Sequence, residues 1–172
     1  MKNNNWIVKA FLLTFIIAII FNTFSNIIIN KFDNLIVLIF LSLLFILLGI
    51  IFDIIGTSVL TAEESTFHAK SSKKIKGAKE GVYLIRNSST IASICNDVIG
   101  DICGIVSGSI SAMIGLIISN KINISSVLAI LIVSSIVSSL TVGGKAIGKK
   151  IAIKKSDEII FKVAKLINKF SK

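Results

Sequence analysis

Four long apolar runs follow one another along the chain, separated by polar segments. A helix that crosses the roughly 30 Å hydrocarbon core of a bilayer needs about 20 mostly apolar residues. The runs at 6–29, 35–62, 91–118 and 124–142 meet this requirement. Each of the first two holds one charged residue, the third holds two and the fourth holds none. The pattern therefore predicts an all-α integral membrane protein with four transmembrane helices.

Two polar segments predict helices outside the bilayer. Residues 156–158, Ser-Asp-Glu, are typical of a helix start, because a hydroxyl N-cap precedes acids in the first turn. We expect an amphipathic C-terminal helix within 146–172, which lies on an anionic leaflet or packs on another subunit. Its apolar residues recur at helical spacing: Ile159, Val163, Leu166, Ile167 and Phe170. The segment 63–89 predicts a juxtamembrane helix that Gly77 and Gly81 weaken.

Composition agrees with a membrane protein and excludes several other classes. Of 172 residues, 53% are hydrophobic and 16% are charged, whereas soluble domains have about 25% charged residues. The apolar content excludes a disordered chain, and the absence of Pro with only 2 Cys excludes collagen-like and disulfide-stapled proteins. The net charge is +10, yet the single Tyr and the lack of a groove-reading motif argue against nucleic acid as a partner.

The basic residues predict the orientation. Six lie in 63–89 and nine follow residue 144, whereas each of the two remaining turns holds one, Lys31 or Lys121. By the positive-inside rule we expect a multi-pass protein of the cell membrane with both termini cytoplasmic. The first apolar run is longer than the core of a signal peptide, so we expect it to stay uncleaved. Six lysines are expected to contact anionic inner-leaflet lipids: Lys73, Lys74, Lys149, Lys150, Lys154 and Lys155.

Three aspartates inside the apolar runs are the most informative charges. An ionisable side chain in a span costs about 2.5–3.5 kcal/mol on insertion scales, so it faces a protein interior or a wet cavity. Asp53 and Asp97 each lie nine residues from the cytoplasmic end of their spans, which places both about 14 Å deep. Asp101 follows Asp97 by one turn on the same face. We therefore expect the three carboxylates near one level.

Neighbouring carboxylates without a basic partner are either protonated or share a cation. Oxygen ligands suit Mg²⁺ or Na⁺, and a glycine allows local unwinding. The sequence thus predicts a cation or proton site formed by Asp53, Gly56, Thr57, Asn96, Asp97 and Asp101. The alternative is that protonated or Asn-bonded acids only hold the helices together.

The third run also carries small residues and both cysteines. Gly100, Gly104 and Gly108 form two overlapping G-x-x-x-G steps, so we expect close helix packing there, with the acids turned inward. Cys95 and Cys103 are separated by about 12 Å along one helix, so they should remain reduced. The sequence holds no nucleophile–base pair, P-loop, CxxC or HExxH motif, so we expect neither an enzyme nor an organic cofactor.

Five segments together resemble one known family. They are the end of the second run, FDIIGT at 52–57; a basic juxtamembrane stretch at 68–81; the lead-in to the third run, LIRN at 84–87; its polar part, CNDVIGDICGIVSG at 95–108; and the turn after the fourth run, GKAIGK at 144–149. Over about residues 45–165 the chain resembles the transmembrane domain of the cyclin M (CNNM) and CorB/CorC magnesium-transporter family.

The resemblance implies a homodimer tied to Mg²⁺ or Na⁺ movement, with a cation site around Asp53, Gly56 and Thr57. Residues 35–172 would form the CNNM-like domain, and 1–34 an additional N-terminal span with its outer turn. The sequence departs from the family where Lys145 and Gly148 replace the Glu and Pro of a turn. The Ser-Gly-Ser-Glu motif of the family is not retained, and we expect no CBS domains.

We therefore expect a protein of divalent-cation (Mg²⁺ or Co²⁺ type) transport or homeostasis. The alternative is a non-transporting regulatory or scaffold subunit that binds anionic lipid or a partner protein. A small pore or toxin-immunity protein is a third hypothesis.

Overall fold

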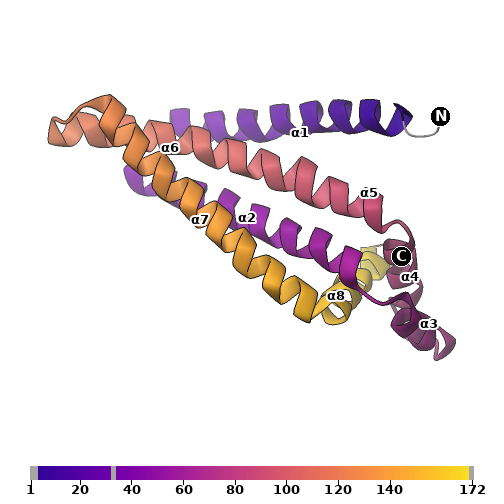
Figure 1. Ribbon diagram of the computed structural model, residues 1–172. Coiled ribbons are helices and arrows are strands. Elements are labelled where there is room, and N and C mark those ends of the chain that lie inside the picture. The colour runs from indigo at the N-terminus through magenta and orange to yellow at the C-terminus, as the bar shows by residue number, and fades with distance from the viewer. Residues whose placement is uncertain (1–3, 32–33, 171–172) are drawn as a thin grey trace. The chain divides into compact units, whose positions relative to one another are not determined.

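The computed structural model describes residues 4–31 and 34–170, and every regular element in them is a helix (Figure 1). One of these, η1, is a π-helix, in which the backbone bonds run from each residue to the fifth one along. The elements are α1 (Asn4–Lys31), α2 (Leu35–Thr61), α3 (Glu64–Ser72), α4 (Ala78–Arg86), α5 (Ser88–Ala92), η1 (Ser93–Gly100), α6 (Asp101–Ile122), α7 (Ser126–Lys154) and α8 (Ser156–Phe170).

Four helical stretches are long and apolar enough to cross a membrane: Val8–Ile27, Leu35–Thr61, Ser88–Ile122 and Ser126–Lys154. The expected all-helical class with four such helices is therefore confirmed. The third stretch joins α5, η1 and α6 end to end, so a π-helix lies inside it.

Two of the expected polar helices have different limits. The segment 63–89 is not one helix, because α3 and α4 are separated by a turn in which Lys74 has φ 53° and Gly77 has φ 89°. L-residues rarely adopt such angles, so the helix cannot continue there. The C-terminal amphipathic helix begins at Ser156 rather than at 146, because α7 continues through the basic residues to Lys154.

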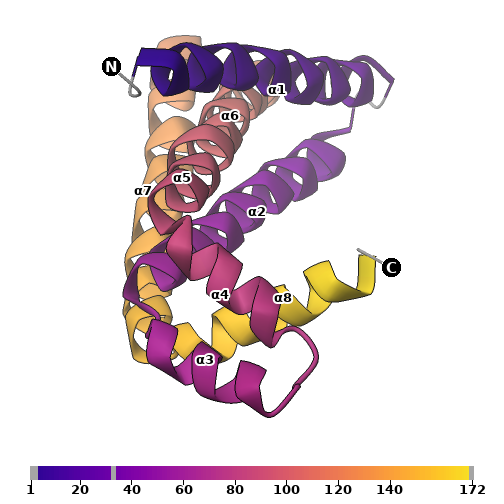
Figure 2. The same ribbon diagram turned by 90° about the vertical axis from the view of Figure 1, so that its right-hand side faces the viewer.

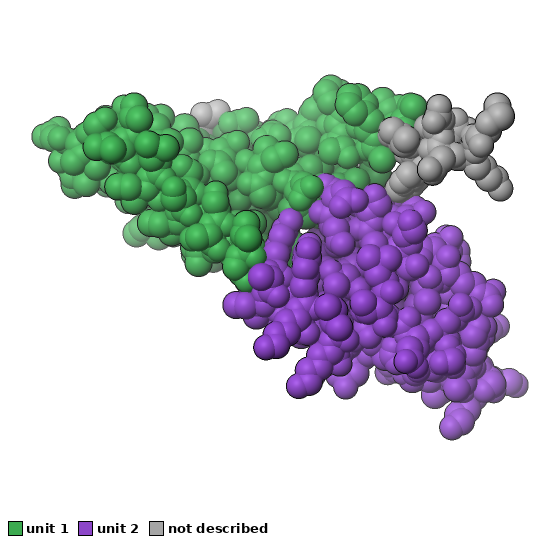
Figure 3. Space-filling view, viewed as in Figure 1, with its two compact units in different colours: residues 1–50, 98–144 green, residues 51–97, 145–172 purple. Residues whose placement is uncertain are grey.

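The chain divides into two compact units, residues 1–50 with 98–144 and residues 51–97 with 145–172 (Figure 3). Unit 1 contains α1, α6 and parts of α2 and α7. Its core joins one face of α2 to one face of α6, and α1 adds partly buried apolar side chains. The fully buried members are Leu38, Leu41, Phe45, Val98, Ile102, Cys103, Val106, Ile110 and Ile114.

Close contacts between helices fix the packing inside unit 1. The rings of Phe21 in α1 and Phe45 in α2 have centroids 5.7 Å apart. A Cβ added to Gly115 in α6 would lie 2.7 Å from the Ile130 Cα in α7. Only glycine permits that approach of two backbones, which is how small residues promote helix packing in lipid.

Unit 2 has its own core, built by α3, α4 and α8 with the adjoining ends of the long helices (Figure 2). Phe67 of α3 is fully buried, and its ring lies against Gly81 of α4, where a Cβ would overlap it. Ile160 and Ala164 of α8 complete the cluster. The apolar residues of α8 therefore divide into two groups: Ile160 and Ala164 pack inside the unit, whereas Leu166, Ile167 and Phe170 are exposed.

The start of α8 is bonded to the turn after α2. The Ser156 hydroxyl donates a hydrogen bond to the Thr61 carbonyl at 3.4 Å, and the Glu63 N–H donates to Asp157 Oδ1 at 3.0 Å. The expectation that Ser156 caps its own helix is thus wrong, because its hydroxyl and the neighbouring carboxylate bond another segment. These bonds hold α8 beside the end of α2.

Candidate functional site

Asp53 is the one charged residue of α2, and it is buried. Its helix is otherwise a run of Leu, Ile, Phe and Val with a few small or hydroxyl residues. The Asp53 side chain is 2% exposed. Because a carboxylate in an apolar span is costly unless protein surrounds it, this burial is the environment that the sequence required.

Gly56 lies one turn after Asp53 and contacts Asn96 of η1. A Cβ at position 56 would lie 2.7 Å from the Asn96 Cγ and still closer to its Oδ1. The Asn96 Oδ1 is buried and has no hydrogen-bond partner among the described residues. An amide oxygen in this state has lost hydration without replacement, which costs about 1–3 kcal/mol and calls for an explanation.

The π-helix presents Asn96 and Asp97 from the third span. Ser93 Oγ donates a hydrogen bond to Asp97 Oδ2 at 2.9 Å, so a side chain of η1 orients this carboxylate. π-helical segments within longer helices recur at functional sites, because the added residue per turn re-aims side chains. Asp53, Gly56, Asn96 and Asp97 all belong to unit 2.

The three aspartates do not form one ligand set. Asp53 is buried, whereas Asp97 and Asp101 are exposed. Among residues 4–31 and 34–170, no group of three or more His, Cys, Asp or Glu side chains is arranged to hold a metal ion. Asp101 also lies in unit 1 rather than unit 2. The expectation that all three acids turn inward is therefore wrong for Asp97 and Asp101.

Asp97 and Asp101 are exposed because a different face of the third apolar stretch packs into the core of unit 1. The face of α6 that enters the core of unit 1 carries the large side chains Ile102, Val106 and Ile110. Large apolar side chains gain more dispersion contact than glycines do, so they take the packed face. Gly100 is buried, and its carbonyl would lie 3.4 Å from a Cβ at Gly49.

Gly104 and Gly108 differ from Gly100. A Cβ added to either would meet no atom within 4 Å, so the close packing expected at these two glycines is not seen within the described chain. The two cysteines behave as expected: Cys95 and Cys103 are both buried, and neither forms a disulfide.

The remaining predicted residues lie at the edges of the site or outside it. Thr57 is half-buried, and its carbonyl accepts a hydrogen bond from the Thr61 hydroxyl at 3.1 Å. The six lysines expected to contact lipid are all exposed, as such a role requires: Lys73, Lys74, Lys149, Lys150, Lys154 and Lys155.

The metal ligands that this site offers are all oxygen atoms. The Asp53 carboxylate and the Asn96 carbonyl suit a hard cation such as Mg²⁺ or Na⁺, and no thiolate or imidazole of the site competes. The contact of Gly56 with Asn96 and the π-helical geometry were not predicted. One hint of this contact is present in the sequence: Gly56 and Asn96 lie at similar predicted depths in consecutive apolar runs.

Comparison of the chain with protein-family models, with curated proteins and with solved structures found no match. The resemblance to the CNNM and CorB/CorC family therefore stays a hypothesis that depends on the quoted residues alone.

Proposed function

We propose that this chain is a membrane protein of cation transport or homeostasis, in which Asp53 is the central ligand and the Asn96 carbonyl the second. The observation that carries the proposal is the burial of Asp53, which is 2% exposed within the C-terminal half of an apolar helix. Polar groups at such depth are expensive and most often serve an ion or proton pathway.

The chemistry of the two side chains favours a hard cation. A carboxylate supplies charge and an amide carbonyl supplies a dipole, and both are oxygen ligands of Mg²⁺ and Na⁺. A cation between them would satisfy the Asn96 Oδ1, which has no hydrogen-bond partner among the described residues. A proton on Asp53 is the competing occupant of the site.

Movement of the ion requires that the site open alternately to the two sides. Gly56 gives α2 a position without a side chain at the contact with Asn96. The π-helix η1 can exchange its bonding pattern for an α-helical one, which would turn Asn96 and Asp97 about the helix axis. We assign the gating movement to this pair of segments.

The remaining parts of the proposal concern setting and assembly. The protein would lie in the cell membrane with both termini cytoplasmic and form a homodimer. Its exposed lysines, for example Lys149 and Lys150, would contact anionic inner-leaflet lipids. The ion is proposed as divalent, of the Mg²⁺ or Co²⁺ type, on the family resemblance.

Ion flux into liposomes tests the proposal. Wild type should move Mg²⁺ or Na⁺ down a gradient, and Asp53→Asn should abolish that flux. Ser42→Ala is the matched control, because it removes another buried polar side chain of the same helix, α2. Equal flux for wild type and Asp53→Asn would overturn the proposal.

A non-transporting regulatory or scaffold subunit is the second candidate. The exposed apolar end of α8, with Leu166, Ile167 and Phe170 next to lysines, favours it, since such a surface suits lipid or a partner. A partner that copurifies with a chain lacking any flux would select this function.

A further inference from the structure

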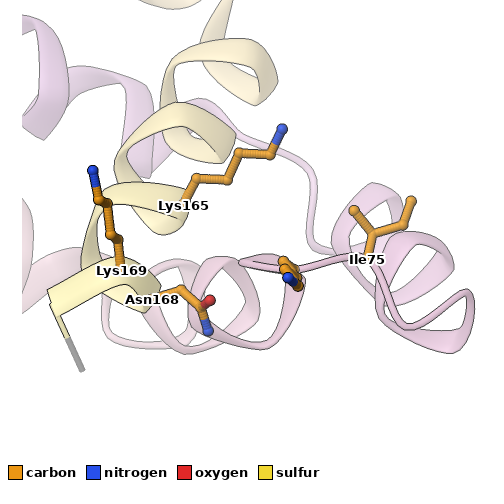
Figure 4. A pocket seen from close by; sticks show the side chains of 5 residues that line it. Ile75, Lys165, Asn168 and Lys169 are labelled. Atoms are coloured by element: carbon orange, nitrogen blue, oxygen red, sulfur yellow. The ribbon is translucent and has the colours of Figure 1, made fainter. Parts of the chain in front are cut away.

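A cavity rich in lysines lies in unit 2, between the α3–α4 turn and α8. It consists of two adjoining hollows of about 460 Å³ and 490 Å³, which share Ile75, Lys76 and Asn168. Figure 4 shows Lys165, Asn168 and Lys169 on α8 and Ile75 on the segment after α3. None of these residues belongs to the candidate intramembrane site. The lysines of the walls are Lys74, Lys76, Lys79, Lys165 and Lys169.

The charge in this lysine cavity is poorly balanced. Glu80 is the one carboxylate of the lining, against five lysines, and it accepts a hydrogen bond from Asn168 Nδ2 at 2.6 Å. The ion pairs of Glu64 with Arg86 and His68 lie outside this lining. Lys165 Nζ lies 4.4 Å from the centroid of the Phe161 ring. The other four lysines of the lining have no described carboxylate within 4.0 Å, so their positive charge is available to an anion.

The wall of the cavity is fixed by its backbone. Gly77 has φ 89°, and a Cβ there would lie 3.0 Å from the Lys165 backbone nitrogen and 3.1 Å from its Cα. The turn is therefore held tightly against α8. This packing places lysines from two separate elements around one hollow.

Fixed hydrogen-bond donors add to the lysines. α4 begins at Ala78, and both Gly77 before it and Lys79 in its first turn line the cavity. The first N–H groups of a helix lack intrahelical acceptors and favour anions. The Ala78 N–H already donates to the Ile75 carbonyl at 3.1 Å, so the N–H groups that follow it in the first turn are the ones that an anion can use. Ser71 contributes a hydroxyl group to the same wall, and the Ser72 hydroxyl there donates to the Ala69 carbonyl at 2.9 Å.

We propose that the lysine cavity binds a phosphate monoester or a diphosphate. Such a group carries close to two negative charges and several acceptor oxygens, which match clustered lysines and a helix N-terminus. The volume leaves space for the group to which the phosphate is attached. This chemistry has two sources, the headgroup of a phosphorylated lipid and a free phosphorylated molecule.

Titration with a soluble probe tests whether the cavity binds a free phosphorylated molecule. The full chain is placed in phosphatidylcholine nanodiscs, and pyrophosphate binding is measured by calorimetry. Lys76→Gln and Lys169→Gln should each weaken binding about tenfold, the usual effect of losing one charge-assisted bond. Lys162→Gln is the matched control, since it removes an exposed lysine of α8 that does not line the cavity. Circular dichroism checks that each variant stays folded.

Lipid retention tests whether the cavity binds the headgroup of a phosphorylated lipid. Nanodiscs that hold equal amounts of phosphatidic acid and phosphatidylserine are analysed by native mass spectrometry. Retention of phosphatidic acid over phosphatidylserine, reduced by Lys76→Gln and kept by Lys162→Gln, would assign the cavity to a lipid. Saturable pyrophosphate binding without lipid preference would assign it to a soluble ligand. Absence of both, or an equal loss in Lys162→Gln, would overturn the proposal.

Discussion

The side-chain amide of Asn96 lies against Gly56, with the Asn96 Cγ 2.7 Å from the place that a Cβ at position 56 would take. This contact joins the π-helix of the third span to α2, one turn after the buried Asp53. A side chain at position 56 would therefore displace the Asn96 amide, whose oxygen lies against α2 one turn beyond Asp53.

Gly56→Ala should displace Asn96. Overpacking a tight contact costs about 1–3 kcal/mol, so the variant should unfold at lower temperature in detergent and lose cation transport. Gly108→Ala is the control: a Cβ there meets no atom within 4 Å, and in a helix the change should be neutral or stabilising. Equal stability of Gly56→Ala and wild type would show that the contact is not as tight as described.

Asn96→Ala should abolish cation binding while leaving the stability of the protein nearly unchanged. Its Oδ1 has no hydrogen-bond partner among the described residues, so removal forfeits no hydrogen bond there and should change the free energy of unfolding by less than about 1 kcal/mol. A ligand that binds only the folded protein raises its melting temperature. We expect Mg²⁺ or Na⁺ to raise the melting temperature of wild type but not of Asn96→Ala. An unchanged ion effect in the variant would remove Asn96 from the site.

Gly77→Ala should loosen the α3–α4 turn from α8. The residue has φ 89°, and an added Cβ would lie 3.0 Å from the backbone of Lys165. The combined strain should cost about 1–3 kcal/mol. Hydrogen exchange of α4 and α8 should rise in this variant, whereas Gly143→Ala, in open space, should leave it unchanged. Unaltered exchange in Gly77→Ala would contradict the described turn.

The ion pair of Glu64 should make α3 sensitive to acid. The hydrogen bond from Arg86 Nε at 2.7 Å, with a second from His68, holds the pKa of Glu64 below its ordinary value of 4.5. A lowered pKa means that the folded state binds the carboxylate form better. The stabilisation is therefore complete above the ordinary pKa and is lost as the pH falls through the lower, folded value.

Hydrogen exchange of α3, followed from neutral to acidic pH, checks this sign. Protection should decrease on acidification in wild type, and Arg86→Gln should show a weaker pH dependence because the principal partner of Glu64 is gone. A steeper acid loss in Arg86→Gln than in wild type would refute the assignment.

Hydropathy predicted the four helices that are long and apolar enough to cross a membrane, because apolar length is a property of the sequence alone. The burial of Asp53 was predictable for the same reason, since a lone carboxylate in an apolar helix must be covered. The break at Lys74 was not, because a positive φ in a lysine depends on packing around the turn.

The outward position of Asp97 and Asp101 also escaped prediction. A stripe of small and polar residues is compatible with either a packed or an exposed helix face. Which of the two it forms depends on the side chains that the neighbouring helices bury. Here Ile102 and Ile110 enter the core of unit 1, so the opposite face is open. The π-helix also has more residues per turn than an α-helix, so the directions of its side chains differ from those that a 3.6-residue period predicts.

Cation binding by the purified chain tests the role of Asp53 most directly. Calorimetric titration of Mg²⁺, and separately of Na⁺, into the protein in detergent should show one saturable site in wild type. Asp53→Asn should remove that site, while Ser42→Ala, which alters another buried polar residue of α2, should retain it. Binding of the same affinity and stoichiometry in wild type and Asp53→Asn would contradict the assignment of Asp53 as the cation ligand.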